Sequence, residues 1–224
     1  MTVSCQHDSI LSMEKMPSTV HIAIYPTWAD WEPSYLISRI NSPAWQREPG
    51  SFQVRTVADS HEPVTSMGGL RVVPDLTFAD LTPKHSAMLV LPGGDVWDVD
   101  PTATEAAVHA AQAFLAADVP VAAICGATAG MARAGLLDDR DHTSSALEYL
   151  LYAGGGYAGA ARYRHEPVVN DGGLITAGPT RPVEFARAAL EQLGPFTPDV
   201  LDAWYRYFGR HDSSAFAVLA GANA

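Results

Sequence analysis

The sequence predicts an α/β fold in which helices cover both faces of a mainly parallel β-sheet. Short β-rich runs alternate along the chain with longer helical stretches. Two of the runs, residues 87–91 and 119–124, are almost continuously apolar, as strands covered on both faces of a sheet are. Hydrophobic residues make up 47% of the 224 residues and charged residues only 17%. This composition provides enough apolar side chains for a large core.

The first half of the chain carries three predicted strands of this sheet. Residues 20–25 predict the first strand, and Asp30 is a suitable N-cap for a helix that continues through Ile40. Residues 52–57 alternate between apolar and polar side chains, which indicates a second strand. The apolar run at 87–91 is the third, and the tight loop Pro-Gly-Gly-Asp follows it.

The second half begins with an alanine-rich helix over residues 102–117 and a buried strand over 119–124. That strand leads without a spacer into a helix directed towards Ala134, which Gly135 ends. The alternation of strand and helix therefore continues past the middle of the chain.

A β-hairpin and two further helices complete the predicted fold. The sequence Asn-Asp-Gly-Gly separates residues 162–169 from 174–177, which is a strong hairpin signal. Helices are expected over 183–193 and 199–208. The chain has no internal repeat and no linker. We therefore expect a flexible leader over residues 1–17 and one α/β domain over 18–224.

Charge and cysteine content exclude several classes of partner and compartment. The formal net charge of −11 opposes binding to nucleic acid or to an anionic membrane, and no apolar run is long enough to span a bilayer. The two cysteines, Cys5 and Cys125, cannot form a disulfide framework. A cytoplasmic, reducing environment is therefore expected.

Cys125 is the strongest candidate for a reactive residue. It lies between a predicted strand and a predicted helix, where reactive groups of open α/β sheets are found. Its frame Ala-Ile-Cys-Gly-Ala has the small residues that the tight turn of a nucleophile elbow requires. The N-terminus of the following helix should stabilise the thiolate and lower the pKa of the thiol. The alternative is an ordinary buried core cysteine.

Two further features could assist Cys125. Gly93 and Gly94 follow a strand, where a backbone N–H without a side chain could stabilise an oxyanion, although an ordinary tight turn is the alternative. Trp28 and Trp31 precede Glu32 in the sequence, and Pro33 follows it. Desolvation there would raise the pKa of its carboxyl, which could then relay a proton. A solvated Glu32 at the start of a helix is equally compatible with the local sequence.

These residues give the chain a resemblance to the ThiJ/PfpI family of the class I glutamine amidotransferase-like superfamily. The matching motifs occur in consistent order over about residues 20–194, at residues 30–33 (DWEP), 91–95 (LPGGD), 122–128 (AAICGAT), 142–144 (HTS) and 171–177 (DGGLITA). The resemblance implies a flavodoxin-like fold with an added β-hairpin and an extra C-terminal helix, and a homodimer. It also implies a nucleophilic Cys125, a partner Glu32, and an oxyanion site near Gly94 and Gly126.

The chain departs from the family's pattern where a histidine would assist the cysteine. Peptidase-like members place His directly after the nucleophile, where this chain has Gly126, and the other family position aligns near Ser145. His142 is the one histidine in a stretch that could approach Cys125; Thr128 is a further accessory candidate. Without a neighbouring general base, amide hydrolysis loses its usual proton shuttle, so peptidase activity is not expected. No cofactor or metal motif is present.

Two classes of function follow. The first is an enzyme whose Cys125 thiolate adds to an electrophilic carbon of a small molecule, with Glu32 relaying the proton: a hydrolase acting on an amide, or a hydratase or lyase acting on a reactive carbonyl. The second is a non-enzymatic dimer, redox-sensing or chaperone-like, whose Cys125 is oxidised.

Overall fold

The computed structural model describes residues 17–222, so residues 1–16 of the predicted leader lie outside the described part of the chain. The strands are β1 (Ser18–Ala23), β2 (Phe52–Ala58), β3 (Val64–Thr65), β4 (Arg71–Val72), β5 (Leu76–Thr77), β6 (Ser86–Leu91), β7 (Val121–Ile124), β8 (Val168–Asp171) and β9 (Leu174–Ala177). The helices are α1 (Ser34–Asn41), α2 (Val96–Val99), α3 (Glu105–Ala116), α4 (Gly126–Arg133), α5 (Leu147–Ala153), α6 (Pro182–Leu193), α7 (Pro198–Gly209) and α8 (Phe216–Gly221).

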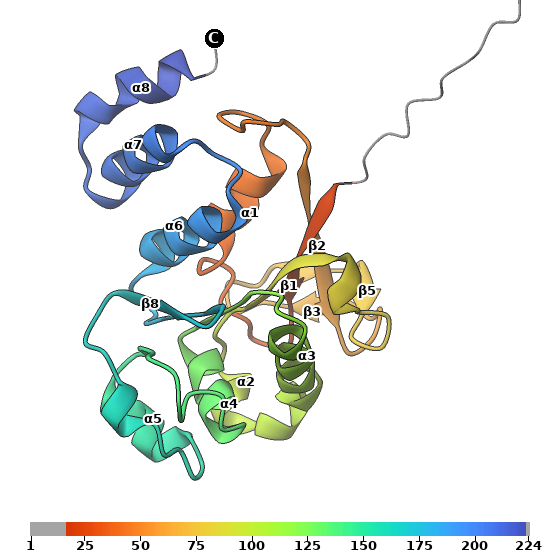
Figure 1. The fold of residues 1–224 in the computed structure, drawn as a ribbon. Helices are drawn as coiled ribbons and strands as arrows, with labels where there is room; N and C mark the ends of the chain where they lie inside the picture. The colour runs from red at the N-terminus through yellow and green to blue at the C-terminus, as the bar shows by residue number, and fades with distance from the viewer. Residues whose placement is uncertain (1–16, 223–224) are drawn as a thin grey trace, which may run out of the picture.

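Seven strands form one sheet in the order β5-β2-β1-β6-β7-β9-β8 (Figure 1). Every neighbouring pair is parallel except β8 and β9. Strands β3 and β4 form a separate antiparallel pair. Helices α1, α6 and α7 lie on one side of the sheet, and α2, α3 and α4 lie on the other (Figure 1). This is the flavodoxin-like α/β sandwich that the sequence predicts.

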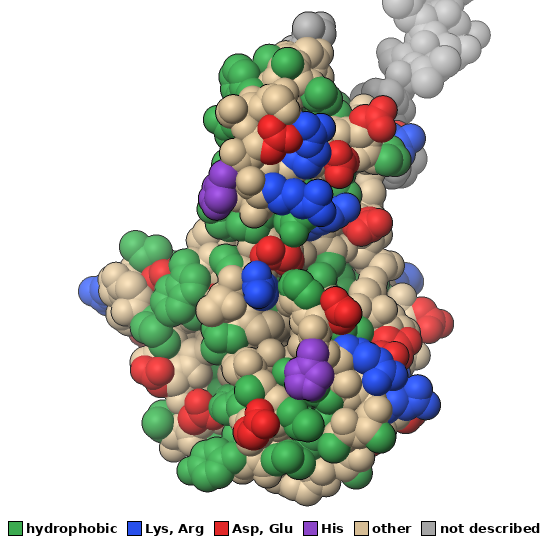
Figure 2. Space-filling model, turned by 90° about the vertical axis from the view of Figure 1, so that its left-hand side faces the viewer, with side chains coloured by type: hydrophobic (Ala, Val, Ile, Leu, Met, Phe, Trp, Pro, Cys, Tyr) green, Lys and Arg blue, Asp and Glu red, His purple; other side chains and the backbone are tan. Residues whose placement is uncertain are grey.

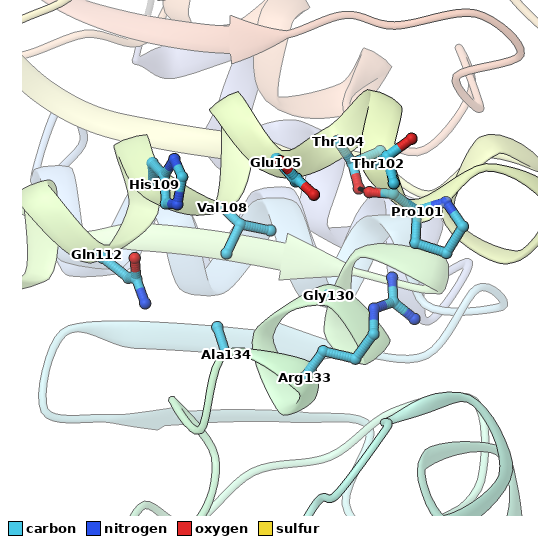
Figure 3. A pocket seen from close by; sticks show the side chains of 10 residues that line it. All are labelled: Pro101, Thr102, Thr104, Glu105, Val108, His109, Gln112, Gly130, Arg133 and Ala134. Carbon is cyan, nitrogen blue, oxygen red and sulfur yellow. Dashed lines mark hydrogen bonds between the residues drawn. The ribbon is translucent and has the colours of Figure 1, made fainter.

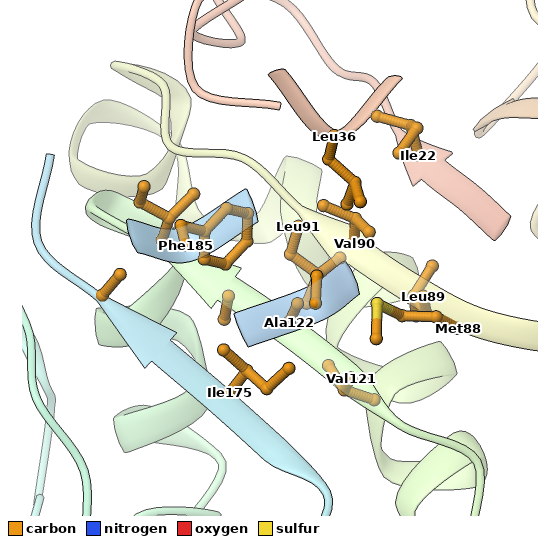
Figure 4. Packing of buried hydrophobic residues seen from close by; sticks show 14 of the residues in the cluster. Ile22, Leu36, Met88, Leu89, Val90, Leu91, Val121, Ala122, Ile175 and Phe185 are labelled. Carbon is orange, nitrogen blue, oxygen red and sulfur yellow. The ribbon is translucent and has the colours of Figure 1, made fainter. Parts of the chain in front are cut away.

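The core lies between the central strands and the two helical layers. All four residues of β7 and the last four of β6 are buried, which explains their continuously apolar sequences. From the helices, Leu36 of α1 and Phe185 of α6 pack towards the sheet (Figure 4). A sheet buried on both faces fixes the positions of its strand ends, and the candidate site is built there.

The hairpin is confirmed at the predicted turn, with a shorter first arm. Strand β8 begins at Val168 rather than at residue 162, and Asp171 pairs with Leu174 across a two-residue turn. The turn residues Gly172 and Gly173 have φ angles of 57° and 80°, which glycine adopts without steric cost.

The first predicted helix begins later than expected. Helix α1 begins at Ser34 with Pro33 at its N-cap, so Asp30 does not cap it. The Asp30 carboxylate instead accepts hydrogen bonds from the Ser66 hydroxyl and, at 2.9 Å, from the Gly68 N–H of the β3–β4 hairpin. Glu32 therefore lies in the turn before the helix rather than within it. This position lets its side chain point back towards the sheet.

Most of the other differences concern short elements. The predicted helix over 102–117 begins as a 3-10 turn, Pro101–Thr104, and becomes α-helical only from Glu105. Six elements of two to seven residues each were not predicted from the sequence: β3, β4, β5, α2, α5 and α8. Elements of this length show too few repeats of a strand or helix period to be recognised.

Binding to a nucleic acid requires a basic surface, and crossing a lipid bilayer requires a long apolar helix. On the face shown in Figure 2, acidic and basic side chains are interspersed, and no broad basic patch is visible. In the described part of the chain, no helix combines the length and the apolar character needed to cross a lipid bilayer.

Trp97 of α2 is completely buried and fixes how closely α4 can approach. A Cβ atom placed on Gly130 would lie 2.2 Å from Cζ3 of the Trp97 ring, and one placed on Gly126 would lie 3.1 Å from its Cβ. The indole N–H donates to the Tyr25 hydroxyl at 2.9 Å and to the Pro92 carbonyl at 3.0 Å. Trp97 thus joins the start of α4 to the loop after β6.

We expect Gly130→Ala to destabilise the protein by about 1–3 kcal/mol, because the added methyl group overlaps a ring that cannot move away. Chemical denaturation measures the free energy of unfolding. Gly221→Ala in α8 is the matched control, since a Cβ there meets no atom within 4 Å. The prediction is wrong if the two substitutions have the same effect.

Candidate active site

Cys125 occupies the sharp turn between β7 and α4. Its backbone has φ 59° and ψ −127°, a left-handed conformation that is rare for residues other than glycine and costs about 1–3 kcal/mol. The turn is held from both sides: the Cys125 N–H donates to the Ala177 carbonyl at 3.0 Å, and the Thr128 hydroxyl donates to the Cys125 carbonyl at 2.6 Å. Such strain persists only where the surroundings impose it.

Glu32 and Cys125 converge on Gly93. The Gly93 N–H donates to Oε2 of Glu32 at 2.6 Å. A Cβ atom placed on Gly93 would lie 2.9 Å from the Cys125 sulfur and 3.0 Å from Oε2 of Glu32, so only glycine fits between the two side chains. Glu32 is fully buried, and its other oxygen, Oε1, has no hydrogen-bond partner within the described residues. An orphaned buried oxygen next to a thiol is available to exchange a proton.

Burial raises the pKa of both groups in this pair. The pKa of Glu32 rises from 4.5 to about 7, mainly through desolvation, which the hydrogen bond from Gly93 partly offsets. Only one of the two neighbouring tryptophans contributes to this burial: Trp28 is buried, whereas Trp31 is 45% exposed. The pKa of Cys125 rises to about 12, through desolvation and then through the negative charge of Glu32.

The raised thiol pKa differs from the sequence expectation, in which the start of α4 lowers it. The Gly126 N–H does favour the thiolate, but this effect is smaller than desolvation and the Glu32 charge together. The first proton to leave the pair therefore comes from Glu32. Near neutral pH the thiol is protonated and the Glu32 carboxyl is close to its own pKa, so the carboxyl can exist in either protonation state beside the thiol.

The three glycines expected at the oxyanion site have different surroundings. The Gly126 N–H faces the sulfur, and the Gly94 N–H has no protein acceptor within residues 17–222. Gly93 uses its N–H to hold Glu32, so it positions the carboxyl instead. Gly94 must be glycine for a different reason: a Cβ there would lie 2.8 Å from the Thr27 carbonyl oxygen.

Of the three accessory candidates, Ser145 lies at the sulfur, whereas Thr128 and His142 make structural contacts elsewhere. Ser145 lies within hydrogen-bonding reach of the Cys125 sulfur. Thr128 is buried and shares a hydrogen bond of 2.6 Å with the Ser144 hydroxyl, so it ties this segment to the elbow. His142 is also buried, and its two ring nitrogens contact the Arg140 carbonyl at 2.7 Å and the Tyr157 hydroxyl at 2.5 Å.

These contacts leave neither ring nitrogen of His142 directed at Cys125. Its ring is part of the packing around Tyr157 and Tyr163. Among the described residues, no group of three His, Cys, Asp or Glu side chains is arranged to hold a metal ion.

Two cavities open at the carboxyl edge of the sheet. One, of about 520 Å³, lies beyond β1 and β2 and is lined mainly by residues 24–27 and 62–66. The other, of about 340 Å³, lies beyond β9 and is lined by residues 143–145, Tyr163, residues 165–167 and residues 178–181. Ser145 belongs to the second wall and also reaches the sulfur. We call this second cavity the β9 cavity; Cys125 does not line it, and Ser145 connects it to the thiol.

A third cavity, of about 300 Å³, lies between α3 and α4 (Figure 3). Its wall includes Glu105 and His109 from α3 and Arg133 from α4. None of the candidate site residues lines it. We assign the site to the sheet edge, because the strained turn and the buried carboxyl are there.

Two residues near the candidate site, Tyr25 and Arg181, were not predicted from the sequence. Tyr25, which accepts from the indole of Trp97, also donates to the Pro92 carbonyl and so holds the loop that carries Gly93. Arg181 lines the β9 cavity. Tyr25 is the last residue of the strand predicted over 20–25, and Arg181 follows the one predicted over 174–177, so their location at a strand's carboxyl end was a usable signal.

The fold and the site together define an α/β protein with a cysteine on a strained strand–helix turn beside a buried glutamate. Residues 18–192 match the model of the DJ-1/PfpI family, and the chain belongs to that family. This confirms the resemblance identified from the sequence motifs.

Individual relatives agree with this assignment. The uncharacterized protease YoaZ of Bacillus subtilis is 36% identical over 84% of this chain and 89% of its own length. The uncharacterized protease YdeA of the same organism is 34% identical over 80% of this chain and 85% of its own. The crystal structure of a ThiJ/PfpI family protein from Bacillus anthracis superposes with a TM-score of 0.84 at 34% identity, covering 92% of this chain and 97% of the other.

Burial of Glu32 predicts a stability that falls as the pH rises. The folded protein binds this proton more tightly than the unfolded chain does, so the free energy of unfolding decreases between about pH 4.5 and pH 7. The Glu32→Gln variant has no ionisable group at this position, so its free energy of unfolding does not fall in this way. We expect the variant to be more stable than the wild type by about 1–3 kcal/mol near pH 8, and by much less near pH 5.

Urea denaturation of both proteins at the two pH values measures the difference. The exposed Glu105→Gln in α3 is the control, because it removes a carboxylate far from the thiol. A stabilisation by Glu32→Gln that is equal at both pH values would contradict the assignment.

Proposed function

We propose that this protein is a cysteine-dependent enzyme that adds the Cys125 sulfur to an electrophilic carbon of a small molecule. The observation that carries the proposal is the convergence of a strained Cys125 and a buried Glu32 on Gly93. A packed core cysteine needs neither a left-handed backbone nor a carboxyl without a partner for one of its oxygens.

In the proposed reaction, Glu32 moves one proton between sulfur and substrate. As the sulfur bonds to a carbonyl carbon, the carboxylate takes the thiol proton and the C=O electron pair moves to oxygen. The N–H groups of Gly126 and Gly94 stabilise the resulting oxyanion. Glu32, now a carboxylic acid, returns the proton to the departing nitrogen or to the oxygen. In a hydrolysis, water then releases the acyl group from the sulfur.

Substrates are expected to be small amides or reactive carbonyls rather than proteins. The names of the two Bacillus subtilis relatives point towards peptide hydrolysis, contrary to the sequence expectation that peptidase activity is absent. In this chain His142 is engaged elsewhere, and the family's other histidine position aligns near Ser145, whose side chain reaches the sulfur. The β9 cavity, of about 340 Å³, suits a small ligand.

A redox-sensing role is the alternative from the sequence. Peroxide attacks the thiolate, and a thiol pKa of about 12 leaves little thiolate near neutral pH. An enzyme with Glu32 as base forms its thiolate only as the substrate reacts, so the raised pKa is compatible with the enzyme and weighs against spontaneous oxidation. Either function is compatible with the homodimer that family resemblance implies, which sedimentation at several concentrations would detect.

We expect Glu32→Gln to shift Cys125 alkylation and turnover in opposite directions. Removing the negative charge lowers the thiol pKa, so the midpoint of alkylation moves to lower pH. Removing the base lowers Cys125-dependent turnover by about 10²–10⁴-fold. The measurements are iodoacetamide alkylation against pH in a Cys5→Ser background, and turnover of a panel of small amides, α-oxoaldehydes and isonitriles.

Glu105→Gln serves as the control and should change neither quantity. A midpoint that moves to higher pH in Glu32→Gln would mean that a protonated Glu32 stabilises a resting thiolate. If no compound in the panel shows turnover that depends on Cys125, the enzyme proposal fails.

A further inference from the structure

The β9 cavity has a polar wall with one arginine in it. Its residues come from the segment that reaches the sulfur, from the stretch before β8 and from the loop after β9. The wall carries the hydroxyl groups of Thr143, Ser144, Ser145 and Thr180. Arg181 is its only Lys or Arg residue. Cys125 itself does not line this cavity, but Ser145 both lines it and reaches the sulfur. A small molecule that extends from the thiol past Ser145 would therefore enter the cavity that contains this guanidinium.

The Arg181 guanidinium is largely unsatisfied by the protein. It makes no hydrogen bond within the described residues, and its one ion pair there is with Oε1 of Glu184 at 3.9 Å. That oxygen also accepts a hydrogen bond from the Tyr205 hydroxyl at 3.4 Å. The side chain is 48% exposed, so the pairing with Glu184 is weak. The planar fork of N–H donors is free to bind another carboxylate.

The position of Arg181 also favours a negative ligand. It is the N-cap residue of α6, a helix of 12 residues whose first turn has no side-chain cap. Glu166 is in the same wall, and Glu184 is in the first turn of α6. These two carboxylates oppose an anion, so recognition has to come from direct contact with Arg181 rather than from the overall charge of the cavity.

We infer that the substrate of Cys125 carries a carboxylate, which Arg181 binds while the sulfur attacks an electrophilic carbon several bonds away. This inference rests on the proposed function and adds to it the class of substrate: a small carboxylic acid with an amide or carbonyl group. Arg181 is then a specificity-determining residue in the wall of the β9 cavity.

The test compares two alkylating reagents of equal size. N-iodoacetylglycine and N-iodoacetylglycinamide present the same reactive carbon and differ in one charge. Each forms an S–C bond with Cys125 and releases iodide, so the ratio of their rates cancels the thiolate fraction. We expect Arg181→Gln to lower the charged-to-neutral ratio by at least about fivefold, because a charge-assisted contact is lost.

Two variants and one condition separate this effect from a general change in the protein. Arg181→Lys should retain most of the ratio, since it keeps the charge. Arg162→Gln should leave the ratio unchanged, because that arginine is outside the cavity wall and pairs with Asp141 at 3.6 Å. Raising the ionic strength should lower the wild-type ratio and leave that of Arg181→Gln nearly constant.

The outcomes distinguish the two proposals. If Cys125 reacts with neither reagent, the proposed nucleophile fails. If both reagents alkylate Cys125 and the ratio is the same in wild type and Arg181→Gln, the carboxylate inference is wrong and the proposed function stands. An equal fall of the ratio in Arg162→Gln would also overturn it, because the effect would then come from net charge alone.

Discussion

The hydrogen bond from the Gly93 N–H to the buried carboxyl of Glu32 is the contact on which the site depends. It holds an ionisable group inside the protein, beside a thiol, at the cost of desolvating both. The charge of Glu32 makes the thiolate less favourable, and the pKa of the carboxyl lies below that of the thiol, so the carboxyl ionises first. The absence of a side chain on Gly93 makes this approach possible, and the chemistry proposed for Cys125 follows from it.

The rest of the fold keeps this arrangement in place. The parallel sheet brings the ends of β6, β7 and β9 to one edge, so three separate loops meet there. Trp97 then ties the loop after β6 to the start of α4 through its indole and through the small residues it packs against. The left-handed backbone of Cys125 and the buried Glu32 both reduce stability, and the large apolar core offsets these costs.

Membership of the DJ-1/PfpI family accounts for the scaffold, while the proposed chemistry depends on departures from the family's pattern. Gly126 follows Cys125 and Ser145 faces the sulfur, so the proposal assigns proton transfer to Glu32. The loop after β9 supplies Arg181, which gives the adjacent cavity a charge of its own. Fold and family thus define where the proposed reaction would take place, and in the proposal these side chains select the molecule that takes part.

The sequence by itself determined the sheet, the hairpin turn and the location of Cys125, because apolar runs, glycine pairs and small residues act over a few neighbouring positions. It also placed Glu32, Gly93 and Gly94 near strand ends. Tertiary structure alone decided that Gly93 serves Glu32, that His142 is turned away and that the thiol pKa is raised. Those outcomes depend on desolvation and on tertiary contacts, such as that of Glu32 with Gly93, 61 residues away, and that of His142 with Tyr157, 15 residues away, and no local pattern records them.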